Sequence, residues 1–226
     1  MRHRRIEQLM TREVVSVRGD APFKEIARAL SQHQVSAVPV VDGGGRVVGV
    51  VSEGDLLRKT ADQAATPGDP PAVPELKAWE RAKAEGTRAE ELMSAPAVCA
   101  RSDWTVAEAA RLMEVQGVKR LVVVDDQDRP VGIVSRRDLL GVFLRRDDAI
   151  RREIVEDVLG DTLRLEPTAL AVAVHDGRVE ITGRLPFRGM IPAIERMCTT
   201  VDGVVSVSCT RLTYDVDDTE RGGGRS

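Results

Sequence analysis

Gly132-Ile133-Val134-Ser135-Arg136-Arg137-Asp138-Leu139-Leu140 has an earlier counterpart in the chain, Gly49-Val50-Val51-Ser52-Glu53-Gly54-Asp55-Leu56-Leu57. The two stretches lie 83 residues apart (138 − 55 = 83). The same offset relates Leu9-Met10 to Leu92-Met93, Asp42 to Asp125, and Arg46 to Arg129. An ungapped alignment of 6–57 on 89–140 has 21 identities in 52 positions. Self-similarity at one fixed period indicates that a supersecondary unit was duplicated, and we expect the copies to pack on each other because each alone has too small a core.

Each copy has the hydrophobic pattern of a short strand, an amphipathic helix, an apolar strand, a hairpin and a closing helix. The expected elements of the first copy are a strand over 14–17, a helix that opens at 20–22, strands over 37–41 and 47–51, and a helix over 52–59. Those of the second copy are a strand over 97–100, a helix that opens at 103–106, strands over 121–124 and 131–134, and a helix over 135–144. In both copies the closing helix begins at a serine.

The rest of the chain forms a linker, a third unit and a tail. Four prolines within 60–74 indicate a loop or a mobile linker, and Pro74–Gly86 has the pattern of a helix. Trp79 on that helix fits either a lid over a pocket or a cover for apolar surface on its own chain or on a partner subunit. A type I′ turn signal at Asp176-Gly177 joins two strands of the third unit, whose pattern is helix, strand, strand, helix, strand. The predicted boundaries are 1–62 and 89–147 for the repeats, 63–88 for the linker and its short helix, 148–214 for the third unit and 215–226 for a disordered tail.

Composition and charge exclude several classes of protein. The formal net charge of −3 gives no general attraction to nucleic acid or to an anionic membrane. The basic residues at 2–5 are followed by Ile6-Glu7-Gln8-Leu9 and not by an apolar core, so we expect no signal peptide. No run of about 18 apolar residues exists, so we expect no membrane span. Cys99, Cys198 and Cys209 lack metal-type spacing and indicate reduced, mostly buried thiols in a cytoplasmic protein.

The repeated Ser-x-x-Asp has two compatible interpretations. A serine at a helix start, answered by an acidic residue three positions later, is nearly a capping box and explains why a helix begins there. The same helix start presents free N–H groups and a positive dipole end, which suit a phosphate. A carboxylate in the first turn can also accept hydrogen bonds from both ribose hydroxyls. Only the second interpretation predicts a ligand.

The sequence gives little support for a metal site, a glycine-rich phosphate loop or a catalytic site. His3, His33 and His175 have no ligand-like spacing, so we expect no metal site. The acidic run 125–128 lacks the remaining ligands of a calcium loop and favours a solvated turn. Gly43-Gly44-Gly45 is not followed by the Lys-Ser/Thr of a phosphate loop. No nucleophile–base pair can be named, so we expect neither an enzyme nor a cofactor beyond a regulatory ligand.

With these residues in hand, 6–147 resembles a tandem pair of CBS domains, also called a Bateman module. The features that carry the resemblance are Leu9-Met10, the stretch 35–42 and the Gly-hydrophobic-hydrophobic-Ser-x-x-Asp-Leu-Leu turn, each with its second copy. The segment 118–135 is similar to the nucleotide-binding repeats of the γ subunit of AMP-activated protein kinase. Residues 148–214 resemble a BON domain, through 172–174, 179–183 and 203–205. The resemblance implies an α+β chain in which two βαββα CBS repeats pack as a pseudo-symmetric pair and a small αββαβ BON-like domain follows.

The resemblance also implies a ligand and a set of contacts. Asp55 and Asp138 would bind ribose, and Ser52 and Ser135 would lie near phosphate. Lys119 and Arg120 fit either a solvated basic pair or a phosphate contact, whereas the matching first-repeat residues, Ser36 and Ala37, carry no charge. We therefore expect the Asp138 cleft to bind an adenosine nucleotide more tightly than the Asp55 cleft. The adenine would contact apolar walls and backbone near the brief strands, at Ser16, Val98 and Ala100.

Three hypotheses of function follow. The first is a regulatory sensor of AMP, ADP, ATP or a related adenosine ligand, which forms a homodimer and passes ligand occupancy to an unidentified protein partner. The second is an interaction protein, in which 148–214 contacts phospholipid or the cell envelope and the repeats are a dimerisation scaffold. An enzyme is the third and least supported. A role with nucleic acid is not expected, because the chain has no basic stripe and no recognisable motif.

Overall fold

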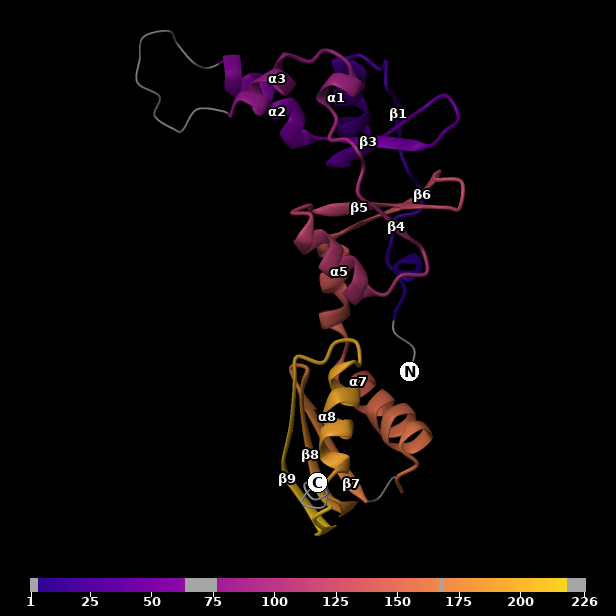
Figure 1. The fold of residues 1–226 in the computed structure, drawn as a ribbon, viewed down its shortest axis with the longest axis vertical. Helices are drawn as coiled ribbons and strands as arrows, with labels where there is room; N and C mark the ends of the chain where they lie inside the picture. Colours follow the sequence, from indigo (N-terminus) through magenta and orange to yellow (C-terminus); the bar gives the residue numbers. More distant parts are fainter. Residues whose placement is uncertain (1–3, 64–76, 167–168, 219–226) are drawn as a thin grey trace, which may run out of the picture. The chain divides into compact units, whose positions relative to one another are not determined.

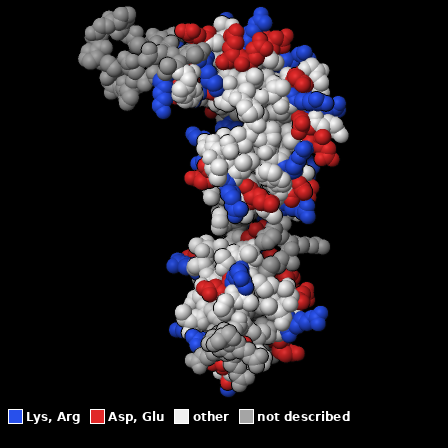
Figure 2. Space-filling model, in the orientation of Figure 1, with Lys and Arg blue, Asp and Glu red and all other residues white. Residues whose placement is uncertain are grey.

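The computed structural model describes residues 4–63, 77–166 and 169–218. They form two compact units, one of residues 5–136 and one of Arg4 together with 137–218. Figure 1 shows the course of the chain through both. On the face drawn in Figure 2, acidic and basic side chains are interspersed over both units. None of the described helices is both long enough and apolar enough to cross a membrane.

The unit of residues 5–136 contains two three-stranded sheets of the same topology. The first sheet and its helices are β1 (Val17–Arg18), α1 (Phe23–Gln32), β2 (Ala37–Val41), β3 (Val47–Ser52) and α2 (Glu53–Gln63). The second set is β4 (Cys99–Arg101), α5 (Val106–Val115), β5 (Arg120–Val124) and β6 (Pro130–Ser135), followed by α6 (Arg136–Leu140), which begins at the last residue of this unit and continues into the other. In each sheet the brief strand pairs in parallel with the middle strand, which pairs antiparallel with the last. The predicted βαββα order is thus confirmed.

The duplicated aspartates hold the hairpin turns. Asp42 Oδ1 accepts from the amides of Gly44 at 2.8 Å and Arg46 at 2.9 Å, and these bonds hold its pKa below the usual value. Asp125 Oδ1 accepts from the amides of Gln127 and Arg129, each at 2.9 Å. The carboxylate at the head of the acidic run 125–128 therefore caps its own turn, in keeping with a structural role.

The short segments that precede the two sheets are exchanged. The segment with η1 (Ile6–Gln8) lies on the second sheet, where the Ile6 amide donates to the Trp104 carbonyl at 2.9 Å and Thr11 bridges Ile133. The segment with α4 (Ala89–Leu92) lies on the first sheet, where Val50 bridges Ser94, and its Ala89 and Leu92 are buried in the first core. Each sheet therefore needs the other repeat's leading segment to complete its packing.

This exchange explains two repeated residues that the pattern alone left unexplained. Met10 covers Gly132, and Met93 covers Gly49, so closely that a Cβ at either glycine would overlap the methionine sulfur. A side chain on either glycine would push the thioether away from the sheet. The duplicated Gly and the duplicated Leu-Met are therefore two halves of one packing contact.

The linker contains helix α3 (Ala78–Glu85), between Lys77 and Gly86. It packs alongside α2, as Figure 1 shows. The predicted start at Pro74 and most of the Pro-rich stretch lie outside the described residues. Trp79 is 55% exposed, and its ring lies 5.5 Å from the guanidinium of Arg58 on α2.

The second compact unit is a three-stranded sheet with helices and its own core. Its elements are η2 (Gly141–Leu144), α7 (Asp147–Glu153), its π-helical continuation η3 (Ile154–Thr162), β7 (Leu170–His175), β8 (Arg178–Phe187), α8 (Met190–Thr199) and β9 (Ser206–Val216). Strand β8 is central, antiparallel to β7 and parallel to β9. The core includes Ile150, Ile181 and Ile194, all fully buried. Asp176 and Gly177 both have positive φ, as the predicted type I′ turn requires.

Some element boundaries differ from prediction. The brief strands lie later than 14–17 and 97–100, because only Val17 and Arg18, and Cys99 to Arg101, pair with a neighbour. The closing helix of the second repeat changes to the tighter turn η2 at Gly141, a residue of low helix propensity. Strand β9 runs to Val216, past the predicted start of the tail, and residues 219–226 lie outside the described part.

Candidate functional site

The candidate site is built on the two strand-to-helix turns. In the second repeat Arg120 pairs with Ser135 across β5 and β6, and the Arg136 amide donates to the Lys119 carbonyl at 3.0 Å. In the first repeat Ala37 pairs with Ser52, and the Glu53 amide donates to the Ser36 carbonyl at 3.1 Å. Directly opposed residues of an antiparallel pair have neighbouring side chains. The ladder thus brings Arg120 and Ser135 together, and places uncharged Ala37 at the equivalent position of the first repeat.

Arg120 also lies in the electrostatic field of the first repeat. Its side chain is half-buried, and burial lowers the pKa of its guanidinium, whereas the nearby charges of Glu53 and Asp55 raise it. The cation predicted to contact phosphate therefore faces the acidic turn of the first repeat as well as Ser135.

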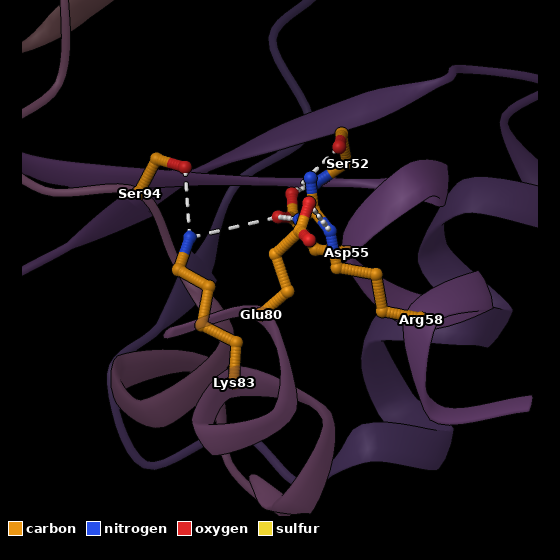
Figure 3. A network of polar contacts seen from close by, with 6 residues as sticks. All are labelled: Ser52, Asp55, Arg58, Glu80, Lys83 and Ser94. Carbon is orange, nitrogen blue, oxygen red and sulfur yellow. Dashed lines mark hydrogen bonds and ion pairs between the residues drawn. The ribbon is translucent and has the colours of Figure 1, made fainter. Parts of the chain in front are cut away.

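Asp55 is enclosed by donors from its own chain, as Figure 3 shows. Its Oδ2 accepts from the Ser52 amide at 2.8 Å and from the Ser52 hydroxyl at 2.6 Å. Its Oδ1 accepts from Arg58 Nη1 at 2.5 Å and lies 3.6 Å from Lys83 Nζ. The residue is only 4% exposed. Half of the predicted capping box is thus present at Asp55, because its carboxylate accepts from the Ser52 amide, but the Ser52 hydroxyl donates to the carboxylate instead of accepting from the helix. The role of Asp55 on ribose stays a prediction that requires an exchange of partners.

The enclosure extends into the linker helix. Lys83 Nζ also donates to Ser94 Oγ at 2.9 Å, and Arg58 Nε lies 3.9 Å from Glu80 Oε1. Sequence reasoning missed this network. The i,i+3 spacing of Asp55 and Arg58 was a signal for their ion pair, but nothing in the sequence placed Lys83 beside Asp55.

Asp138 occupies the matching position in the first turn of α6. It follows Ser135 as Asp55 follows Ser52, but it is half-buried where Asp55 is buried. Lys119 and Ser36 are exposed, and Ser135 and Ser52 are half-buried. The assignment of these residues to a ligand stays a prediction.

The residues predicted near adenine have varied exposure. Ser16 is exposed just before β1, and Val98 is half-buried just before β4. Ala100 and Ala37 are 2% and 3% exposed, in β4 and β2. The two alanines offer backbone more than side chain to a ligand. Among the described residues, no three His, Cys, Asp or Glu side chains gather as metal ligands.

Comparison with known proteins identifies both parts of the chain. The CBS domain family model matches residues 6–62 and 89–145, and the BON domain model matches 147–214. The CBS domain-containing protein DDB_G0289609 of Dictyostelium discoideum is 28% identical over 62% of this chain and 91% of its own length. The uncharacterized protein MK0525 of Methanopyrus kandleri is 28% identical over 63% of this chain. The matched region spans 64% of the length of MK0525.

Solved structures agree on the fold of the CBS part. The CBS domain pair of MJ0100, in complex with 5′-methylthioadenosine and S-adenosyl-L-methionine, has a TM-score of 0.51 at 22% identity, over 63% of this chain and 97% of that one. CBSX2 in complex with AMP has a TM-score of 0.51 at 24% identity, over 62% of this chain and 96% of the CBSX2 chain. The CBS model thus covers both βαββα repeats, and the BON model covers the αββαβ unit that follows them in the sequence: the chain belongs to the CBS domain family and consists of a tandem CBS pair followed by a BON domain.

Proposed function

We propose that the protein is a non-catalytic regulatory module that binds an adenosine nucleotide at the second-repeat turn and passes its occupancy to a protein partner. The observation that carries the proposal is the pairing of Arg120 with Ser135 at a helix start. A cation and a hydroxyl there offer phosphate contacts, and Asp138 in the first turn offers a ribose acceptor. The adenosine ligands of MJ0100 and CBSX2 support the ligand class.

Calorimetric titration of the full chain with AMP, ADP and ATP tests this proposal. Saturable binding that Asp138→Ala weakens at least tenfold supports it. A matched control is Asp103→Ala, which removes an exposed carboxylate from the turn before α5 of the same repeat. Absence of heat and of thermal stabilisation at millimolar ligand would refute it.

Self-association belongs to the same proposal. Leu57 and Leu140 occupy equivalent positions in the two repeats, and they are 64% and 62% exposed. These two exposed leucines are the candidate contacts with another subunit. We expect a homodimer by analytical ultracentrifugation, and a monomer after Leu57→Glu with Leu140→Glu. An unchanged sedimentation coefficient would contradict this part of the proposal.

A second candidate function rests on the BON domain. Phe187 and Val216 pair at the end of β8 and β9, and they are 47% and 51% exposed. Such a pair suits contact with an apolar surface, including that of phospholipid. Co-sedimentation of the full chain with phosphatidylglycerol vesicles, lost in Phe187→Ser, would favour this function; equal recovery with and without vesicles would exclude it.

A further inference from the structure

We propose that helix α3 is an internal lid on the first repeat, in which Arg58 and Lys83 occupy the Asp55 carboxylate and a nucleotide reaches Asp55 only when α3 moves away. This inference rests on the proposed function and concerns the regulation of its weaker site. It starts from the polar network in Figure 3 and from the difference between the two repeats.

The acceptor sites of Asp55 are already filled. A carboxylate offers about four lone-pair positions. Ser52 uses two of them on Oδ2 through its amide and hydroxyl, and the cations of Arg58 and Lys83 approach Oδ1. The two Ser52 donors belong to the turn itself, so incoming ribose hydroxyls must compete with the two cations. With Asp55 only 4% exposed, ribose reaches it only if α3 moves, and that movement withdraws Lys83 while Arg58, on α2, stays beside the carboxylate.

Helix α3 is attached by contacts that can be released. Of its side chains that the structure describes, Trp79 and Glu85 are exposed and Glu80 and Lys83 are half-buried. Its far end is held by Lys59, whose Nζ donates to the carbonyls of Gly86 at 3.1 Å and Glu85 at 3.3 Å. The Arg58–Glu80 ion pair and the Lys59 hydrogen bonds are partly exposed and contribute little net free energy each, whereas the Lys83–Asp55 ion pair is mostly buried and is the main contact that opening must break. A segment held in this way belongs to the least stable part of a fold, the part from which lids are drawn.

The second repeat differs from the first at the positions that correspond to Arg58 and to helix α3. The residue that matches Arg58 is Gly141 (58 + 83 = 141), which carries no charge, and the described residues after α6 form η2 and α7 instead of a second copy of α3. Asp138 is also less buried than Asp55. The lid therefore acts on the first repeat, which takes nucleotide only at concentrations that open α3.

The test uses the full chain with Asp138→Ala, so that only the first repeat binds. Titration calorimetry with AMP is compared between this parent and the same chain with Lys83→Ala. Loss of one ion pair and one hydrogen bond from the closed state should raise the affinity about tenfold, because an apparent affinity scales with the fraction of open molecules. Lys83→Arg, which keeps the charge, should stay near the parent. Lys24→Ala, which removes an exposed lysine from α1, controls for net charge.

A second readout follows the lid itself. Trp79 is on α3, so in a chain with Trp104→Phe and Asp138→Ala, its fluorescence should change as AMP saturates the first repeat. An affinity of Lys83→Ala within twofold of its parent, or Trp79 emission that stays constant through saturation, would overturn the lid. Either result leaves the proposed function intact if the chain with Asp138 binds nucleotide; if that chain binds none, the proposed function itself fails.

Discussion

Substitution of Gly132 by alanine tests the exchanged packing of the two repeats. A Cβ at this position would overlap Met10 Sδ and lie 2.9 Å from Met10 Cγ and 3.3 Å from its Cβ. Met10 is only 9% exposed, so its thioether has little room to retreat. Insertion of a methyl group into such a contact costs about 1–3 kcal/mol of unfolding free energy. We expect Gly132→Ala to fall in that range.

The chain offers both a control and a specific probe. A Cβ at Gly43, in the first hairpin turn, would meet nothing within 4 Å, so Gly43→Ala should change stability by less than about 1 kcal/mol. Both tryptophans, Trp79 and Trp104, lie in the unit 5–136. Tryptophan fluorescence in a urea titration therefore reports the unfolding of this unit alone.

A double-mutant cycle isolates the contact. In a Met10→Ala background the overlap is gone, so the cost of Gly132→Ala should drop by at least about 1 kcal/mol. Equal costs of Gly132→Ala in the two backgrounds would refute the packing of Met10 on the second sheet. A cost no larger than that of Gly43→Ala would refute it as well.

Two further predictions concern the BON domain and the thiols. Asp147 accepts from the amides of Gly177 at 2.9 Å and Asp176 at 2.8 Å, and these hydrogen bonds hold its pKa below the usual 3.8. The stabilisation from this carboxylate is present above pH 3.8 and is lost as the pH falls through the lowered pKa. Asp147→Ala should therefore lower the melting temperature at pH 7 and have the same melting temperature as the parent in acid; an unchanged melting temperature at pH 7 would contradict this. Burial raises the pKa of the Cys198 thiol to about 12, so little of it is thiolate at pH 8. Iodoacetamide at pH 8 should therefore alkylate half-buried Cys99 first and Cys198 last, as measured by peptide mass spectrometry. The reverse order would contradict the described core.

The fold of the CBS pair could be predicted from the sequence because the pattern of each element occurs twice, once in each repeat. Short apolar runs located the two hairpin strands of each repeat, and Asp176-Gly177 located the hairpin of the BON domain. The exchange of leading segments was hidden, because apolar periodicity shows that Leu9-Met10 is buried but not which sheet buries it. Only the joint repetition of methionine and glycine at the same offset hinted at the contact between them.

The site was predicted less completely. The turn sequence located Ser52, Asp55, Ser135 and Asp138 on helix starts, and the β5–β6 register then placed Arg120 opposite Ser135. Local pattern could not show that Lys83, which is 28 residues from Asp55 (83 − 55 = 28), approaches its carboxylate. Such a contact depends on how a linker helix folds back, and that is set by tertiary packing.

Calorimetric titration of AMP into the parent chain, Asp138→Ala and Asp55→Ala is the most direct test of the central claim, that the second-repeat turn binds an adenosine nucleotide. We expect saturable binding by the parent, a loss of at least tenfold in Asp138→Ala and a smaller loss in Asp55→Ala, whose carboxylate is already occupied. Full affinity in Asp138→Ala together with abolished binding in Asp55→Ala would contradict the claim.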